Sequence, residues 1–133
     1  EVLVPAVGQG SLAATCREDD VQANSVLATL CEPATTAAII AERAMLTVLG
    51  GSCHAPTGGL AQPDGQGNLR LRGLIASSDG KEKVDLVMSA PITEAETLGK
   101  TMAEDLLAKG GKEILQSISK LQPAFIPKHP EAD

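Results

Sequence analysis

The chain has 133 residues, which is enough for one domain of ordinary size or for one small domain and a piece of another. Its formal net charge is −6 and no block of basic residues occurs, so nucleic acid is not expected as a partner, because phosphate binding needs clustered Lys and Arg. No apolar stretch approaches the roughly 20 residues that span a bilayer, and no signal peptide is visible. We therefore expect a soluble, cytoplasmic protein without a membrane partner.

The cysteines and histidines are sparse. Cys16, Cys31 and Cys53 are too few and too widely spaced for a disulfide scaffold, and their odd number leaves at least one thiol free. A reducing compartment is the simpler expectation. The chain contains no C-x-x-C pair, and His54 and His129 lie far apart in the sequence, so no metal site is expected.

The first part of the chain predicts a loop, a short strand and a helix. Pro5 and several glycines punctuate the opening loop, and the apolar residues 12 to 16 form a strand candidate that has no partner nearby. Residues 20 to 30 predict a helix that begins after Asp19 or Asp20 as its N-cap.

A second helix is predicted from about Thr36 to Leu49. Pro33 breaks the first helix, because proline disfavours a helical conformation in the residue before it. Gly50 and Gly51 stand where a C-terminal cap belongs, since glycine adopts the left-handed conformation without steric cost. Cys53 is therefore expected on a loop just past the end of this helix.

Three strands follow. Residues 59 to 62 lead into a Gly-rich turn, and in residues 69 to 72 leucines alternate with arginines, which is typical of a strand with one solvent-facing side. An Asp-Gly turn separates this strand from a second alternating run at residues 83 to 88, so we predict an antiparallel hairpin. Its cationic side chains are expected to meet only water: Arg70, Arg72, Lys81 and Lys83.

The C-terminal third predicts two helices. Residues 93 to 96 match a capping box, and the helix that they open ends at Gly110 and Gly111. A short amphipathic helix follows at about residues 112 to 121, and the Pro-rich residues 122 to 133 are expected to be a loose tail. Together the elements predict an α+β fold, in which helices pack on one face of a small three-stranded antiparallel sheet.

Cys53 is the main candidate for chemistry. Its loop is rich in glycine, which lets the backbone approach a bulky group, and the neighbouring His54 is placed to help deprotonate the thiol. A helix C-terminus disfavours a thiolate, however, so the residues alone leave two interpretations open: a functional thiol, or a half-buried loop thiol. For Cys16 and Cys31 we favour a packing role.

Gln9 lies between two glycines, so it either presents its amide to a ligand or belongs to an ordinary connecting loop. A phosphate loop is not indicated, because its third glycine and its lysine are missing. Glu42 and Arg43 lie in a helix rich in apolar residues. They form either a solvated helix face or a partly buried pair that holds neighbouring segments together, and we favour the second interpretation.

Four motifs, in order, resemble those of the porphobilinogen deaminase (hydroxymethylbilane synthase) family. "PAVGQGSLAATCRE" is similar to the family's P-A-V-G-Q-G, apolar residues and C-R, and "AERAMLTVLGGSCHAPTGG" is similar to A-E-R-A followed by L-x-G-G-C-x-x-P-x-G. "GLIASSDG" resembles the family's hairpin turn, and "LGKTMAEDLLAKGGKEIL" resembles its closing pair of helices. These motifs extend over nearly the whole chain.

The resemblance implies a domain arrangement. The family has two similar α/β domains and a small C-terminal α+β domain, of three antiparallel strands backed by helices. Residues 1–30 would be the segment that returns into the first α/β domain, residues 31–121 the cofactor-carrying α+β domain, and residues 122–133 a flexible tail. The partners would then include the missing N-terminal domains of the same enzyme.

The resemblance also implies an activity. The family's transferase condenses four porphobilinogen molecules head to tail, with release of ammonia, in tetrapyrrole and heme biosynthesis. Cys53 matches the cysteine that holds the dipyrromethane cofactor through a thioether, on which the polypyrrole chain grows. Gln9 and Gly10 match the segment that lines the active-site cleft, where substrate binds.

Two departures from the family pattern matter. Ser52 stands where the family usually has glycine, which we do not expect to prevent attachment. The family's catalytic aspartate and its substrate-binding arginines lie upstream, so we expect no catalytic residue in this chain and no activity from the chain alone, because each pyrrole brings two carboxylates that need cationic partners. The alternatives are a non-catalytic α+β interaction or regulatory module derived from this family, and a free-standing thiol enzyme that uses Cys53 with His54.

Overall fold

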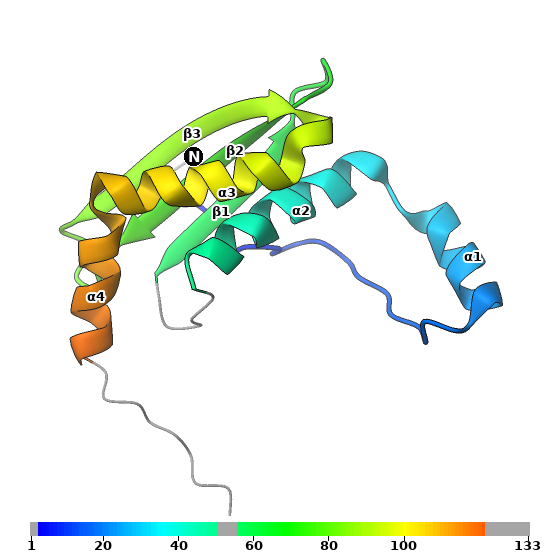
Figure 1. Cartoon of the computed structure of the whole chain (residues 1–133), viewed down its shortest axis with the longest axis horizontal. Coiled ribbons are helices and arrows are strands. Elements are labelled where there is room, and N and C mark those ends of the chain that lie inside the picture. Colours follow the sequence, from blue (N-terminus) through cyan, green and yellow to red (C-terminus); the bar gives the residue numbers. More distant parts are fainter. Residues whose placement is uncertain (1–2, 51–55, 122–133) are drawn as a thin grey trace, which may run out of the picture.

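The computed structural model describes residues 3–50 and 56–121 of the chain. The predicted α+β class is confirmed: three antiparallel strands form an open sheet, with helices packed against it (Figure 1). In chain order the elements are α1 (Val21–Leu30), α2 (Pro33–Val48), β1 (Thr57–Pro63), β2 (Asn68–Ala76), β3 (Lys83–Pro91), η1 (Ile92–Glu94), α3 (Ala95–Leu106), η2 (Leu107–Gly111) and α4 (Lys112–Leu121).

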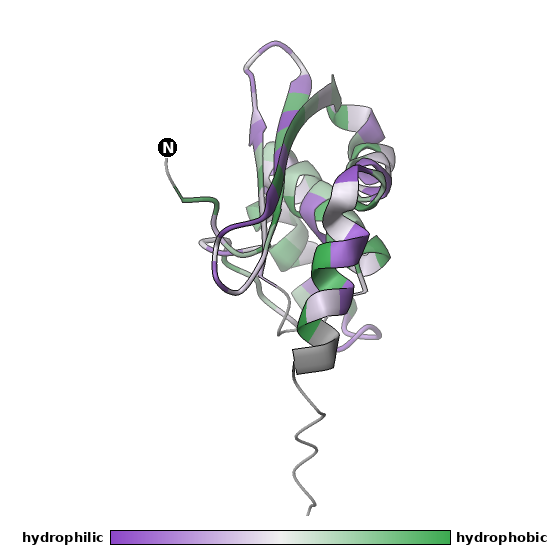
Figure 2. Cartoon of the chain, turned by 90° about the vertical axis from the view of Figure 1, so that its left-hand side faces the viewer, coloured by the Kyte–Doolittle hydropathy of each residue, from purple (hydrophilic) through white to green (hydrophobic). Residues whose placement is uncertain are grey.

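The sheet has the order β1-β2-β3, and both pairings are antiparallel. The predicted hairpin is thus confirmed, and it is longer than the alternating residues indicated. Leu71 of β2 lies opposite Ala61 of β1 and Met88 of β3, and these three residues share the face that the helices cover. The arginines of β2 lie on the other, open face. Figure 2 views the sheet nearly edge-on and shows helices on one side of it.

Small residues bring α2 and α3 into close contact in the layer above the sheet. A Cβ atom on Gly99 of α3 would overlap the backbone oxygen of Ala41 in α2. Beneath this crossing, a Cβ atom on Gly73 of β2 would lie 2.9 Å from Leu106 and 3.0 Å from Met102. Glycine is therefore needed at both positions for the helices to approach each other and the sheet.

The first two helices begin with side-chain caps. Asp20 caps α1, as predicted, and its Oδ1 accepts a hydrogen bond from the backbone N–H of Ala23 at 2.9 Å. The predicted start of α2 at Thr36 is wrong, because the helix begins at Pro33 and Glu32 caps it. Proline fits the first helical position, where its missing N–H would have no partner in the helix anyway.

Two other local predictions fail. Residues 93 to 96 form no capping box: η1 precedes α3, no side-chain hydrogen bond caps α3, and Glu96 pairs instead with Lys100 at 2.6 Å. The strand predicted at residues 12 to 16 is absent, and Leu12 is fully exposed. A strand needs a partner for its backbone groups, and the described residues supply none there.

The helix was predicted to end at Gly110 and Gly111, but α3 ends earlier, at Leu106, and η2 continues the chain to Gly111. The helical path does break at Gly110, whose φ of +110° lies in the left-handed region that favours glycine, and α4 begins directly after Gly111. The tail predicted at residues 122–133 lies outside the described residues. Within the described part of the chain, none of the helices has the length and apolar character needed to cross a membrane.

The N-terminal stretch differs from this body. An extended segment leads to α1, which lies well away from the sheet (Figure 1). None of the α1 residues is buried, and Leu30 at its end is 74% exposed. The predicted apolar face of α1 therefore has no partner among the described residues.

Candidate functional site

Gln9 and Gly10 lie on a tight turn that follows the segment packed on β1, which includes Pro5. Gly8 and Gly10 have φ values of +75° and +89°. The backbone N–H of Gln9 donates to the carbonyl of Ala6 at 3.1 Å, and the Gln9 Oε1 atom accepts from the Ala6 N–H at 3.2 Å. The Gln9 side chain thus closes its own turn through its oxygen, which leaves its Nε2 group as the available donor.

A single buried carboxylate holds this turn. Glu42 of α2 is only 5% exposed, and it is the one charged residue that is buried among the described residues. Its Oε2 accepts from the backbone N–H of Gly8 at 2.7 Å, and its Oε1 accepts from the N–H of Ala61 in β1 at 2.8 Å. The favoured interpretation, a charge that joins neighbouring segments, is confirmed for Glu42.

Arg43 does not share that role. It is exposed, and no ion pair joins it to Glu42 in the described part of the structure. The predicted Glu42–Arg43 pair is therefore wrong, because consecutive helical residues point in different directions: Glu42 faces the sheet and Arg43 faces outward.

The N-terminal segment and Glu42 together supply acceptors along the outer edge of β1. The N–H of Gly59 donates to the carbonyl of Pro5 at 3.0 Å, Ala61 donates to Glu42, and Pro63 has no N–H to satisfy. The approach is close: a Cβ atom on Gly59 would lie 3.0 Å from Val7 and 2.6 Å from the Cε atom of Met45. The segment before Gln9 therefore packs on the sheet edge.

A wide open groove of about 1250 Å³ begins beside this turn. Its walls come from the segment that carries Gln9 and Gly10, from α1, from the outer face of α2 and from β1. The residues that line it include Gln9, Gly10, Ser11, Leu12, Leu27, Leu30, Thr36, Ile40, Arg43 and Thr47. The two predicted substrate-binding residues thus share one groove with the guanidinium of Arg43.

Cys53 lies outside the described residues, so the prediction for it stays a prediction. The structure does describe both sides of its loop. On one side Gly50, with a φ of +90°, follows α2; on the other, Pro56 precedes β1 and its carbonyl accepts from the N–H of Ala76 in β2 at 3.0 Å. The loop therefore starts after α2 and ends at β1, which both pack in the core of the domain.

The other two thiols are exposed, so the packing role that we favoured for them is wrong in this chain. Cys16 lies in the extended segment, where its Sγ donates to the Oδ1 of Asn24 at 3.4 Å, and Cys31 follows the last residue of α1. Within the two described ranges, no three His, Cys, Asp or Glu residues come close enough together to hold a metal ion.

The open face of the sheet carries a second polar cluster. Arg72 donates from Nε and Nη2 to the two carboxylate oxygens of Asp85, at 2.9 Å and 2.7 Å, and both side chains are about three-quarters buried. The expectation that Arg72 meets only water is wrong, because Asp85 lies on the adjacent strand. This hydrogen-bonded guanidinium holds the pKa of Asp85 below its ordinary value.

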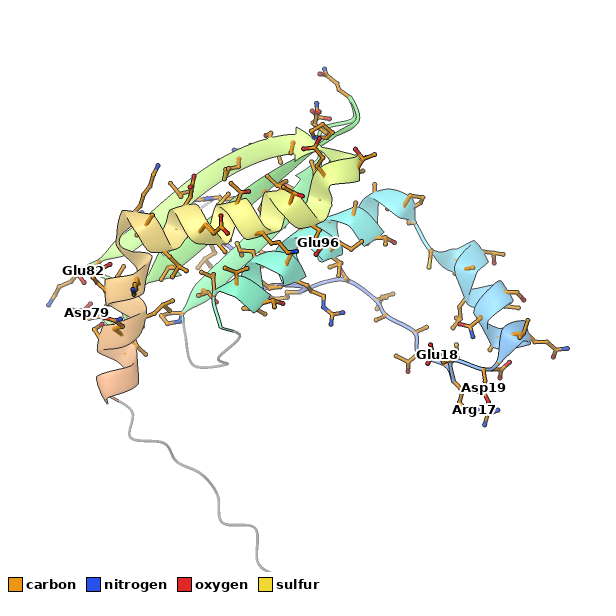
Figure 3. The ribbon with its side chains drawn as sticks, in the orientation of Figure 1. Arg17, Glu18, Asp19, Asp79, Glu82 and Glu96 are labelled. Carbon is orange, nitrogen blue, oxygen red and sulfur yellow. The ribbon has the colours of Figure 1, made fainter. Side chains whose placement is uncertain are left out.

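Other charged groups gather at the extremities of the molecule. Arg17, Glu18 and Asp19 lie where the extended segment meets α1, whereas Asp79 and Glu82 lie in the turn between β2 and β3 (Figure 3). Lys81 in that turn pairs with Asp79 at 3.2 Å. Both clusters are exposed, whereas the carboxylate of Glu42 behind the turn that carries Gln9 is buried.

These features define an α+β domain in which a glycine-rich turn is held against α2 and the edge strand β1. The family model "Porphobilinogen deaminase, C-terminal domain" matches residues 36–108. A curated relative, the porphobilinogen deaminase of Exiguobacterium sp. (strain ATCC BAA-1283 / AT1b), is 45% identical over 120 residues, which are 90% of this chain and 38% of the relative. The chain thus spans less than half the length of this relative. It belongs to the porphobilinogen deaminase family.

Proposed function

We propose that this chain is the C-terminal part of a porphobilinogen deaminase, a transferase of tetrapyrrole and heme biosynthesis. The full enzyme would condense four porphobilinogen molecules head to tail and release ammonia. The observation that carries the proposal is the 45% identity over 90% of the chain, in a region that includes the Cys53 loop.

Within this proposal, Cys53 attaches a dipyrromethane cofactor through a thioether. A thiol is the group that such a bond requires, and Gly50 at the start of the loop adopts a conformation that gives the chain a sharp exit from α2. When bound, the cofactor supplies the pyrrole to which the incoming units are joined. Cys53 is then an anchor, so the unfavourable position of a thiolate near a helix C-terminus does not matter during turnover.

We further propose that Gln9 and Gly10 contact the growing polypyrrole. Both residues line the groove beside β1, and the Nε2 group of Gln9 is available as a donor to a carboxylate. The catalytic and most of the charge-neutralising groups would come from N-terminal domains of the same enzyme. A chain with a net charge of −6 is poorly suited to hold a ligand with several carboxylates alone, so we expect the isolated chain to be inactive.

The domain arrangement of the proposal has its own support. The family model begins at residue 36, no residue of α1 is fully buried, and Leu12 is fully exposed in this chain. We propose that residues 1–30 return into the first α/β domain, which would cover that surface, and that residues 31–121 form the α+β domain. Residues 4–8 would connect the two domains, because they belong to the returning segment and also pack on β1.

Intact-mass measurement of the full-length protein tests the anchor. We expect a mass increase that matches a dipyrromethane, a positive pyrrole colour reaction, and loss of both in Cys53→Ser. Cys31→Ser is the matched control, because that thiol is exposed but is predicted to carry nothing. An adduct that persists in Cys53→Ser contradicts the assignment. Correctly folded full-length protein without colour would instead favour a non-catalytic interaction or regulatory module.

A further inference from the structure

We propose that Glu42 is a positioning residue, whose carboxylate fixes the turn bearing Gln9 and Gly10 relative to α2 and β1. This inference rests on the proposed function only in treating Gln9 and Gly10 as parts of the substrate site. The clamp itself is independent of any cofactor.

The geometry joins three segments that are distant in sequence. Glu42 belongs to α2, Gly8 precedes Gln9 in the N-terminal turn, and Ala61 is in the edge strand β1. Each carboxylate oxygen accepts a separate backbone N–H, at 2.7 Å from Gly8 and at 2.8 Å from Ala61. The position of the turn is therefore tied to both elements that flank the Cys53 loop.

The Glu42 carboxylate is buried, so it needs hydrogen-bond donors from the protein. A carboxylate removed from water is costly unless hydrogen bonds satisfy it, and in the described part of the chain no cation pairs with Glu42. Its helical neighbours on the same face, Ala38, Ala41 and Met45, are buried and apolar. An apolar residue at position 42 would fit that face, but it would leave two backbone donors without acceptors.

The clamp acts on Gln9 directly. Two hydrogen bonds hold the segment, where Pro5 accepts from Gly59 and where Gly8 donates to Glu42, and Val7 packs on the core between them. Gln9 follows Gly8 directly, so without the bond to Glu42 the last fixed residue before Gln9 is Val7. Gln9 and Gly10 would then move relative to β1, while the packed core beneath them keeps its contacts.

The Glu42→Gln variant of the full-length protein tests the clamp. Glutamine keeps one acceptor oxygen but presents an NH2 group to the second N–H, so one of the two amides loses its partner. We expect the amide hydrogen exchange of Gly8 or Ala61 to rise about 10- to 100-fold, as suits the loss of a hydrogen bond to a charged group. Wild-type exchange at both amides in Glu42→Gln would overturn the proposal.

Two controls separate positioning from general destabilisation. Glu104→Gln removes a charge from the exposed side of α3, and Ile114→Ala destabilises the buried side of α4, away from the turn. Neither variant should change exchange at Gly8 or Ala61 selectively. In enzyme with its cofactor attached, Glu42→Gln should lower kcat/KM at least tenfold, whereas Ile114→Ala should keep it within about twofold per folded molecule.

The outcomes distinguish the two proposals. Glu42→Gln that loses thermal stability but keeps wild-type kcat/KM would show a structural role only, and would overturn the positioning role. Wild-type protein that lacks the cofactor mass and turns over no porphobilinogen would contradict the proposed function. In that case, selective loss of protection at Gly8 or Ala61 still supports the clamp, and unchanged protection still refutes it.

Discussion

The molecule has two regions that differ in burial: a packed body, residues 33–50 and 56–118, and an N-terminal arm, residues 11–31. The body buries leucine, isoleucine and methionine between α2, α3, α4 and the sheet, whereas the arm contains a capped helix in which no residue is fully buried. A capped helix is thus no sign of a folded core, because capping satisfies local backbone groups and core formation needs partners for an apolar face.

A leucine-to-alanine substitution in each region should show the difference between them most clearly. Leu106→Ala removes a fully buried side chain and should lower the free energy of unfolding by about 2–5 kcal/mol. Leu30→Ala, at a position 74% exposed, should change it by less than about 0.5 kcal/mol. Urea unfolding of the chain, followed by circular dichroism, measures both. Equal losses would mean that the arm packs on the body in solution.

The ion pair on the open face of the sheet gives a smaller effect that depends on pH. Because Arg72 depresses the pKa of Asp85 from its ordinary value of 3.8, the folded state is stabilised at pH values above that value. This stabilisation is lost as the pH falls through the lower pKa of the folded state. Asp85→Asn should therefore be about 0.5–1 kcal/mol less stable than the wild type at neutral pH.

The two proteins should then become more similar in stability below about pH 4, since protonation removes the ion pair from the wild type as well. Urea unfolding at pH 7 and pH 3 checks this. A difference in stability that stays constant with pH would mean that Asn fails at this position for reasons of packing. Lys81→Gln is a suitable control, because its partner Asp79 lies in the exposed turn.

The smallest change in the free energy of global unfolding is expected from loss of the N-cap of α1. Asp20→Ala removes the hydrogen bond to Ala23 and should raise amide exchange within α1 about fivefold, as expected for a cap worth about 1 kcal/mol. The free energy of global unfolding should stay unchanged. Glu32→Ala, which removes the cap of α2, should lower the urea midpoint instead. A matching shift of the midpoint in Asp20→Ala would show that the arm unfolds together with the body.

Sequence reasoning succeeded where the determining contacts are local. The alternation of Leu69 and Leu71 with arginines predicted β2, Asp20 was recognised as an N-cap, and Gly110 marked the break between α3 and α4. In each case, residues a few positions apart decide the structure. The α+β class followed from the order of these elements.

Sequence reasoning failed where a side chain had several possible interaction partners. Glu96 matched a capping box but pairs with Lys100 one turn later, and Arg72 pairs with Asp85 on the adjacent strand of the hairpin. The role of Glu42 was anticipated only in general terms, because its hydrogen-bond donors lie 34 and 19 residues away in the sequence. The apolar residues that flank Glu42 and Arg43 in the sequence were the available signal. For Cys53, the anchor remains a prediction from motif resemblance.

The closed edge of β1 has a consequence for how the domain behaves when it is cut out of a longer chain. A fragment that begins at residue 31 keeps the sheet but loses Pro5, the acceptor for Gly59, and Gly8, the second donor to Glu42. One side of the sheet then offers unpaired backbone groups to any strand in solution, which is the usual route to edge-to-edge aggregation. We therefore expect the segment around Pro5 and Gly8 to keep the domain soluble by covering this edge of the sheet.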